Sequence, residues 1–158
     1  MSEAQDASGT TRWQRDRLGR VTQKVQMLAN GSTQAAGYTY NAQGLLDTLT
    51  YPGGGLLKHH YAAAGQLTAM DWNGVPLVTG ITWNAAGQAT GWTWAFSTPL
   101  QAGRSYDTAG RMTANDVAAY TWDAAGRLTG IVQVLARPGD ADPVSSSITW
   151  GTVTFTAG

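Results

Sequence analysis

The sequence predicts an all-β protein made of tandem β-hairpin repeats that form a curved antiparallel sheet. Three observations favour this fold class. One short phrase recurs six times along the 158 residues. Apolar and polar residues alternate around each copy, which is the period of a strand and not of a helix. The chain also contains 20 Gly, seven Trp, six Tyr and two Phe, a composition that suits many short strands joined by tight turns.

The repeated phrase begins with an aromatic residue, followed by Asp or Asn, two small residues, Gly, a polar residue, an apolar residue and usually Thr. The closest copies are residues 106–113 and 122–129, the looser ones are 40–46, 61–68 and 83–90, and in residues 15–22 Arg replaces the aromatic residue. The period is near 20 residues, about one hairpin plus its connection, and is too short for a propeller blade.

The centre of the phrase predicts a turn. Asp or Asn followed three residues later by Gly is typical of a type I turn, in which the Asx side chain accepts a backbone hydrogen bond and the Gly adopts a positive φ. Ala62 lacks this acceptor in the third copy. We predict structural repeat turns at Asp16, Gly19, Asn41, Gly44, Gly65, Asn84, Gly87, Asp107, Gly110, Asp123 and Gly126.

Strands are predicted on both sides of each turn. Tyr120 and Trp122 are two residues apart, which places both rings on one face of a strand. After the last turn, uninterrupted alternation predicts Leu128 and Gly130 on one face and Ile131 on the other. The recurring aromatic residues are expected to form cross-strand ladders.

The connections carry further turn signals. The dipeptides Asn30-Gly31 and Asn73-Gly74 are typical of hairpins. Residues 137–147 predict a long exposed loop, and residues 148–155 alternate like a final strand.

The chain shows no composition shift that would mark a second domain. Residues 1–11 are small and polar, so we expect a disordered leader or a cloning remnant there. Residues 12–158 are expected to form a single repeat array.

Composition excludes several classes of function. Ten basic and ten acidic residues give a net charge of +0, which argues against a nucleic-acid-binding surface. The chain has no Cys, and therefore no disulfide and no thiolate metal site. No apolar run reaches the length of a membrane span, so no membrane insertion is expected, and no Sec-type signal peptide is visible.

Few residues are candidates for chemistry. His59 and His60 are adjacent, and on a strand they would point to opposite faces, which disfavours a shared metal ion. Asp16, Asp107 and Asp123 recur at equivalent positions, which favours a structural role, because an active site is needed only once. We therefore predict no catalytic residue, no metal site, no cofactor and no enzymatic activity.

The phrase resembles the YD repeat of the RHS (rearrangement hot spot) family, whose pattern is aromatic-any-Tyr-Asp-any-any-Gly-Arg-Leu-Thr. Residues 120–129 and 106–113 match it closely, and the other copies within residues 12–134 match it less well, with departures at Arg15, Asn41, Ala62 and Asn84. In that family, many such repeats form a hollow β-shell, which often encloses a toxin domain in bacterial polymorphic toxins and type VI secretion effectors. Animal teneurins use a similar shell outside the cell.

This resemblance implies that the chain is a fragment or a short member of an RHS-type shell. It would enclose or shield a polypeptide cargo such as a toxin domain, or present it at the cell surface, in a secreted or surface protein of a bacterium. Its partners would be the remainder of the shell, or further copies that associate through open sheet edges, and the cargo.

A second function remains open from the sequence. Choline- and glucan-binding repeats of cell-wall proteins have a similar period, paired aromatic residues and a similar turn. Residues 87–92 resemble the continuation of that repeat, and Trp92 and Trp94 would then bind a sugar or choline.

Overall fold

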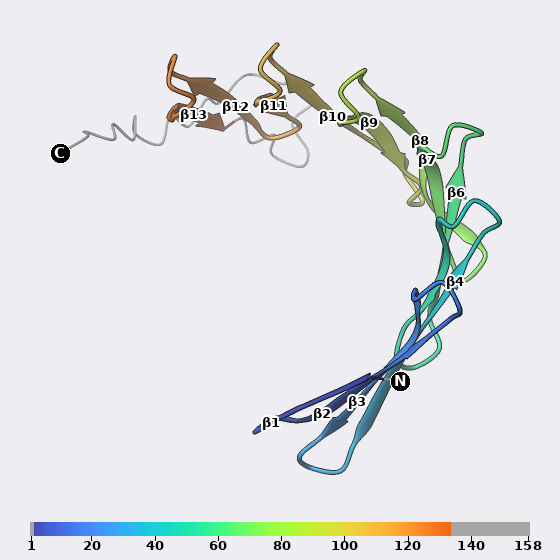
Figure 1. The fold of residues 1–158 in the computed structure, drawn as a ribbon. Helices are drawn as coiled ribbons and strands as arrows, with labels where there is room; N and C mark the ends of the chain where they lie inside the picture. Colours follow the sequence, from blue (N-terminus) through green and yellow to red (C-terminus); the bar gives the residue numbers. More distant parts are fainter. Residues whose placement is uncertain (1, 134–158) are drawn as a thin grey trace. The chain divides into compact units, whose positions relative to one another are not determined.

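The computed structural model describes residues 2–133, and the regular structure in this part of the chain consists of thirteen β-strands (Figure 1). The strands lie in one open antiparallel sheet in chain order, with β1 and β13 at its two edges. Within residues 2–133 no helix is long and apolar enough to cross a membrane. The predicted all-β antiparallel fold is confirmed. The strands are β1 (Ser2–Asp6), β2 (Gly9–Arg15), β3 (Val21–Leu28), β4 (Thr33–Tyr40), β5 (Leu46–Thr50), β6 (Leu56–Tyr61), β7 (Leu67–Trp72), β8 (Val75–Trp83), β9 (Ala89–Trp94), β10 (Leu100–Tyr106), β11 (Met112–Asn115), β12 (Ala118–Trp122) and β13 (Leu128–Gln133).

The chain divides into two compact units. The first consists of Met1–Gly80 with Ala95–Thr98, and the second of Ile81–Trp94 with the chain from Pro99 onward. Each unit contains three of the repeat turns. The predicted loop at 137–147 and the predicted strand at 148–155 lie outside the described residues.

The first residues of the chain differ from the expected leader. Ser2–Asp6 forms β1, which pairs with β2 from Ser2↔Trp13 to Asp6↔Gly9. The turn between them is closed by Asp6, whose Oδ1 accepts a 2.8 Å hydrogen bond from the Ser8 amide. Every residue of β1 is exposed, so backbone pairing and not apolar burial holds the strand, and the sequence shows no hydrophobic alternation there. The prediction of a disordered leader is wrong for residues 2–11.

The Asn-Gly dipeptide between β7 and β8 forms the expected hairpin. Asn73 and Gly74 have φ values of 51° and 81°, and the flanking residues Trp72 and Val75 are directly paired. Two successive positive φ values are the geometry of a type I′ turn, which Asn-Gly favours. This connection was therefore predictable from two residues.

A β-bulge follows the repeat turn and changes the expected faces. In the last hairpin Trp122 pairs with Leu128, but Thr121 pairs with Gly130, so Thr129 is an extra residue. Tyr120 then pairs with Ile131. Directly paired residues share a face, so Ile131 lies on the face of Leu128, and the prediction of uninterrupted alternation is wrong.

The bulge recurs at the same place in other repeats. The register also shifts by one residue next to the turn in the pairs β2–β3, β4–β5, β6–β7 and β10–β11, with the extra residue on the strand after the turn. The extra residue is the last residue of the repeated phrase in four of these hairpins, and in the copy at 40–46 it is the residue that follows the phrase. It is Thr22, Asp47, Thr68, Thr113 and Thr129 in these five hairpins.

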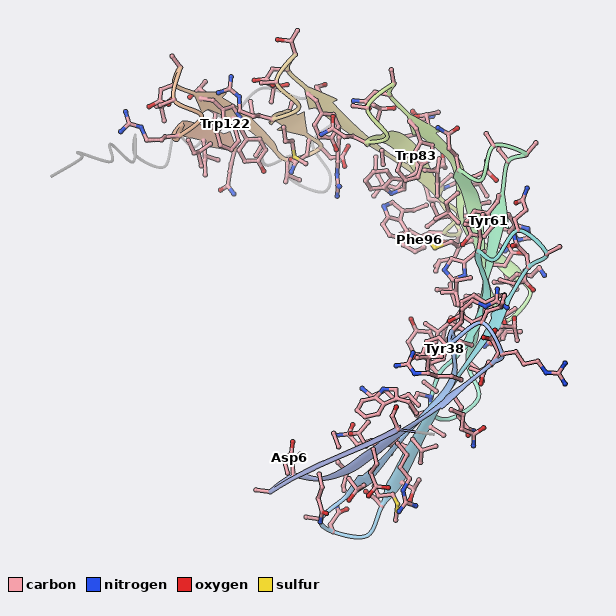
Figure 2. All side chains as sticks on the ribbon, in the orientation of Figure 1. Asp6, Tyr38, Tyr61, Trp83, Phe96 and Trp122 are labelled. Atoms are coloured by element: carbon pink, nitrogen blue, oxygen red, sulfur yellow. The ribbon has the colours of Figure 1, made fainter. Side chains whose placement is uncertain are left out.

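The sheet has very little conventional core. Val78, Ala102 and Ala118 are the buried hydrophobic residues in the part of the chain that the structure describes. Most other residues of the strands are half-buried, among them Tyr38 and Tyr61, which are labelled in Figure 2. Stability must therefore depend on strand pairing and on side-chain contacts between neighbouring strands.

Candidate functional site

The six repeat turns share one backbone geometry. In the fifth repeat the Asp107 amide donates to the Arg111 carbonyl at 2.9 Å, and the Gly110 amide donates to the Asp107 carbonyl at 3.0 Å. Gly110 has a φ of 79°. This is a type I turn followed by a bulge with Gly in the left-handed region. The same two hydrogen bonds close the turns at Asp16–Arg20, Asn41–Leu45, Ala62–Gln66, Asn84–Gln88 and Asp123–Arg127.

The Asx side chain adds acceptors to this turn. Oδ1 of Asp107 accepts 2.9 Å hydrogen bonds from the amides of Ala109 and Arg111. Asn84 accepts the two equivalent bonds at 3.0 Å. Ala62 has no such acceptor, yet its turn keeps both backbone bonds, so the Gly and the hairpin are sufficient for the bend.

Arg follows the turn Gly in three repeats and pairs with the turn Asp. Nε of Arg111 donates to Oδ2 of Asp107 at 2.7 Å. The backbone hydrogen bond from Arg111, joined by the one from its side chain, lowers the pKa of Asp107 despite the opposing effect of burial. The pairs Arg20–Asp16 and Arg127–Asp123 have the same 2.7 Å geometry. The sequence showed that Arg recurs after the turn Gly but did not indicate which side chain it pairs with.

Hydrogen bonds from aromatic side chains join four of the repeats to the repeat before them. We call the aromatic residue at the start of the phrase the leading aromatic residue. Its OH or N–H donates to the first carbonyl of the strand that follows the preceding turn. The pairs are Tyr40–Val21 at 2.8 Å, Tyr61–Leu46 at 2.7 Å, Tyr106–Ala89 at 3.1 Å and Trp122–Met112 at 2.7 Å. Sequence reasoning missed these bonds, because their acceptor is a backbone atom about 10–20 residues away, which no local pattern reveals.

The residue after the turn Gly reaches towards the next repeat. The Arg20 guanidinium lies 4.4 Å from the centroid of the Tyr40 ring, and the Arg111 guanidinium lies 5.9 Å from that of Trp122. Nη1 of Arg111 also donates to the carbonyl of Asp123 at 2.9 Å. One Arg side chain thus contacts its own turn and the following repeat.

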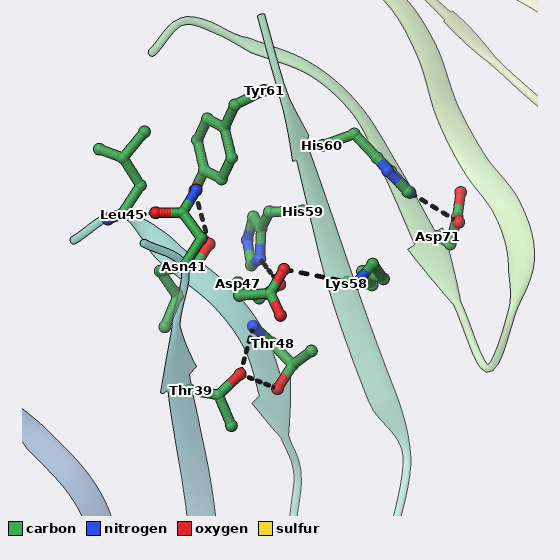
Figure 3. A network of polar contacts seen from close by, with 11 residues as sticks. Thr39, Asn41, Leu45, Asp47, Thr48, Lys58, His59, His60, Tyr61 and Asp71 are labelled. Atoms are coloured by element: carbon green, nitrogen blue, oxygen red, sulfur yellow. Dashed lines mark hydrogen bonds and ion pairs between the residues drawn. The ribbon is translucent and has the colours of Figure 1, made fainter. Parts of the chain in front are cut away.

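The two His residues make separate contacts, as Figure 3 shows. His60 Nε2 lies 2.7 Å from Oδ2 of Asp71, whereas the His59 ring stacks on Tyr61 with centroids 6.3 Å apart. Residues 2–133 contain no group of three His, Cys, Asp or Glu side chains placed to hold a metal ion. Burial, and secondarily the charge of Asp47, raises the pKa of Tyr61.

Trp92 and Trp94 lie on β9 and are half-buried. Their ring centroids are 6.3 Å apart and the rings meet edge to face. The Arg104 guanidinium lies 4.8 Å from the centroid of Trp92. The Trp92 ring therefore already has a cationic partner from this chain.

Comparison with known proteins places this geometry in a fold class. No protein-family model matches the sequence, and no curated protein matches it. A solved structure, TcdB2-TccC3-TEV, matches with a TM-score of 0.59 and 20% identity over 92% of this chain. A Photorhabdus luminescens Tc holotoxin pore with a TccC3 mutation matches with a TM-score of 0.56 and 21% identity over 90% of this chain. These neighbours are RHS-repeat proteins.

The chain has the RHS-repeat fold. It spans only 8% of the first of these matched chains and 7% of the second. Within the RHS-repeat fold, the residues of the phrase have assignable structural roles. Gly allows the turn, and the Asx and Arg side chains form hydrogen bonds within it. The closing Thr, or Asp47, forms the bulge. The leading aromatic residue donates a hydrogen bond to the preceding repeat.

Proposed function

We propose that this chain is a wall segment of an RHS-type β-shell that encloses or shields a polypeptide cargo, such as a toxin domain, or presents it at the cell surface. One observation carries the proposal: the repeated side chains bond to their own turn or to the adjacent repeat. Tyr61 bonds to Leu46, and Arg111 bonds to Asp107 and Asp123. Residues used in this way build a continuous wall.

The mechanism is steric. A wall of paired strands separates the enclosed cargo from proteases and from the cytosol of the producing cell. The wall needs no catalytic group for this. The RHS-repeat fold supports this role, because the matched structures are Tc toxin assemblies with other components. The chain then belongs to a secreted or surface protein of a bacterium, such as a type VI secretion effector.

The partners follow from the open edges of the sheet. Among the strands of residues 2–133, β1 and β13 each have one neighbour, and an edge of this kind favours addition of a further strand. Further shell repeats, or other copies of the chain, would occupy these edges, and a polypeptide would be the enclosed cargo.

The test is limited proteolysis of the native protein isolated from its producing cells. We expect peptides of this chain to resist digestion together with a copurifying polypeptide. The Tyr61→Ala/Trp122→Ala variant should make that polypeptide cleavable, because it removes one inter-repeat bond from each unit. Arg17→Ala, at an exposed turn position, is the matched control and should leave the protection intact. A native protein that protects no polypeptide would contradict the proposal.

A separate titration distinguishes the wall from a carbohydrate- or choline-binding module. Isothermal titration with choline and with cell-wall glycans should give no binding, because Arg104 already occupies the ring of Trp92. Micromolar binding that disappears in Trp92→Ala or Trp94→Ala would favour the binding module.

A further inference from the structure

Tyr51 and Trp72 form an exposed aromatic pair outside the repeated phrases. Tyr51 follows β5 and Trp72 ends β7, so both lie at the strand ends away from the repeat turns. Their ring centroids are 5.5 Å apart, and the ring planes are tilted by 60°. Tyr51 is 41% exposed and Trp72 is 40% exposed. Two large rings therefore lie together in contact with solvent.

The backbone around Trp72 sets the position of its ring. Trp72 pairs directly with Leu57 on β6 and with Val75 on β8. The indole lies against Gly55, where an added Cβ would overlap the six-membered ring. Val75 is 64% exposed and, as a direct partner of Trp72, lies on the same face of the sheet. We call Tyr51, Trp72 and Val75 together the Tyr51–Trp72 patch.

The polar atoms of this patch distinguish its rings from the leading aromatic residues. Tyr40 and Tyr61 are half-buried, and their hydroxyl groups donate to carbonyls of the preceding repeat. The Tyr51 hydroxyl and the Trp72 indole N–H make no hydrogen bond within residues 2–133. Two side-chain donors therefore lie free beside exposed apolar surface, which is a combination typical of a binding site.

We propose that the Tyr51–Trp72 patch binds a proline-rich polypeptide segment in the polyproline II conformation. Pyrrolidine rings would pack on the two aromatic rings, and carbonyls of the segment would accept hydrogen bonds from the Tyr51 hydroxyl and the Trp72 indole. Surfaces lined by exposed aromatic rings recognise such segments in this way. Two residues of a polyproline II helix rise about 6 Å, which is close to the 5.5 Å between the ring centroids. The inference concerns a partner of the exposed patch and does not depend on the enclosed cargo.

Hydrogen-bonding chemistry favours a proline-rich segment over a sugar. An indole N–H can only donate, and a run of Pro has carbonyl groups but no N–H, so its backbone can only accept. A sugar hydroxyl both donates and accepts, but no side chain of the patch is a carboxylate or an amide. Asp71 precedes Trp72 on β7 and therefore lies on the opposite face. Oδ1 of Asn73 already accepts a 2.8 Å hydrogen bond from the Leu56 amide.

The test is a titration of the full-length chain, labelled with 15N-Trp, with an acetylated and amidated decaproline peptide. The indole resonance of Trp72 is assigned by its loss in Trp72→Phe. We expect this resonance to shift during the titration, because its N–H gains an acceptor. The indole resonance of Trp92, whose ring contacts Arg104, should not shift. A parallel titration with chitohexaose tests a sugar at the same patch.

Two variants separate recognition from folding. Tyr51→Phe and Trp72→Phe each keep an aromatic ring and remove one donor, so each should weaken decaproline binding about fivefold in isothermal titration. Tyr120→Phe removes a hydroxyl outside the patch and is the matched control, which should bind like the parent. Circular dichroism checks that all three variants keep the fold.

Three results would overturn the proposal. The first is an unshifted Trp72 indole at about 1 mM decaproline. The second is equal affinity of the parent, Tyr51→Phe and Trp72→Phe for the peptide. The third is a Trp72 indole that shifts with chitohexaose but not with decaproline, which would indicate a sugar-binding patch.

Discussion

The hydroxyl group of Tyr61 donates a 2.7 Å hydrogen bond to the backbone carbonyl of Leu46. The two residues belong to consecutive repeats, so this bond fixes one hairpin against the next. Tyr40 and Val21 make the equivalent bond one repeat earlier. In a sheet with so few buried side chains, such bonds should carry an unusually large share of the stability.

Tyr61→Phe should therefore destabilise the protein although it keeps the ring. The variant removes one hydrogen bond from a half-buried position, and we expect the free energy of unfolding to fall by about 1 kcal/mol. Urea denaturation followed by circular dichroism measures the change. Tyr51→Phe is the matched control, because Tyr51 is 41% exposed and contacts Trp72 through its ring. Equal effects of the two substitutions would contradict a special role for the inter-repeat bond.

Gly126→Val should destabilise the last hairpin by more than about 1 kcal/mol, because a β-branched residue is strained at positive φ. Gly126 has a φ of 79°. A Cβ there would meet only Nη1 of Arg111 at 3.9 Å, so the cost comes from the backbone and not from a clash. Gly126→Asn should cost less, because Asn tolerates the left-handed region. An unchanged melting temperature in Gly126→Val would show that this turn is not formed in solution.

Trp122→Ala should lower the melting temperature more than Asp123→Ala. The first variant loses ring contacts, including the one with Arg111, and the 2.7 Å bond to Met112. The second loses bonds within a turn whose backbone geometry survives without an Asx acceptor, as Ala62 shows. Thermal unfolding of the two variants compares them directly. A larger loss in Asp123→Ala would mean that the turn, and not the contact between repeats, limits stability.

The parts of this fold that were predictable depend on local chemistry. Asp107 and Gly110 define their turn within four consecutive residues, and Asn73-Gly74 defines a hairpin within two, so composition and spacing were enough. The bulge residue was not predictable in this way. Thr129 is compatible with ordinary alternation, and only its pairing across the hairpin shows that it is extra.

The contacts between repeats were also beyond local reasoning. Aromatic residues at strand positions indicated ladders of rings, but the partner of the Tyr61 hydroxyl is a backbone carbonyl 15 residues away. The strand Ser2–Asp6 was missed for a related reason. Its exposed residues carry no hydrophobic pattern, and it is held as a strand by its pairing with β2.

The Arg–Asp turns predict a dependence of stability on pH. Hydrogen bonds from the backbone and side chain of Arg127 lower the pKa of Asp123 below its ordinary 3.8. For Asp16, burial raises the pKa, but the bonds from Arg20 outweigh it and the net direction is also down. A lowered pKa in the folded state stabilises the protein fully above pH 3.8, and this contribution is lost as the pH falls through the folded-state pKa.

Replacement of these Asp residues by Asn should flatten that dependence. Asn84 shows that an amide oxygen accepts the same two backbone bonds, so the turns should survive while the titrating groups are removed. We expect the variant with Asp16→Asn, Asp107→Asn and Asp123→Asn to lose less of its melting temperature than the parent chain between about pH 5 and about pH 2.5. Scanning calorimetry across this range measures both slopes, and Asp116→Asn serves as a control outside the repeat turns. If the triple variant and the parent lose stability in parallel, the turn carboxylates are not the groups that acid protonates to destabilise the sheet.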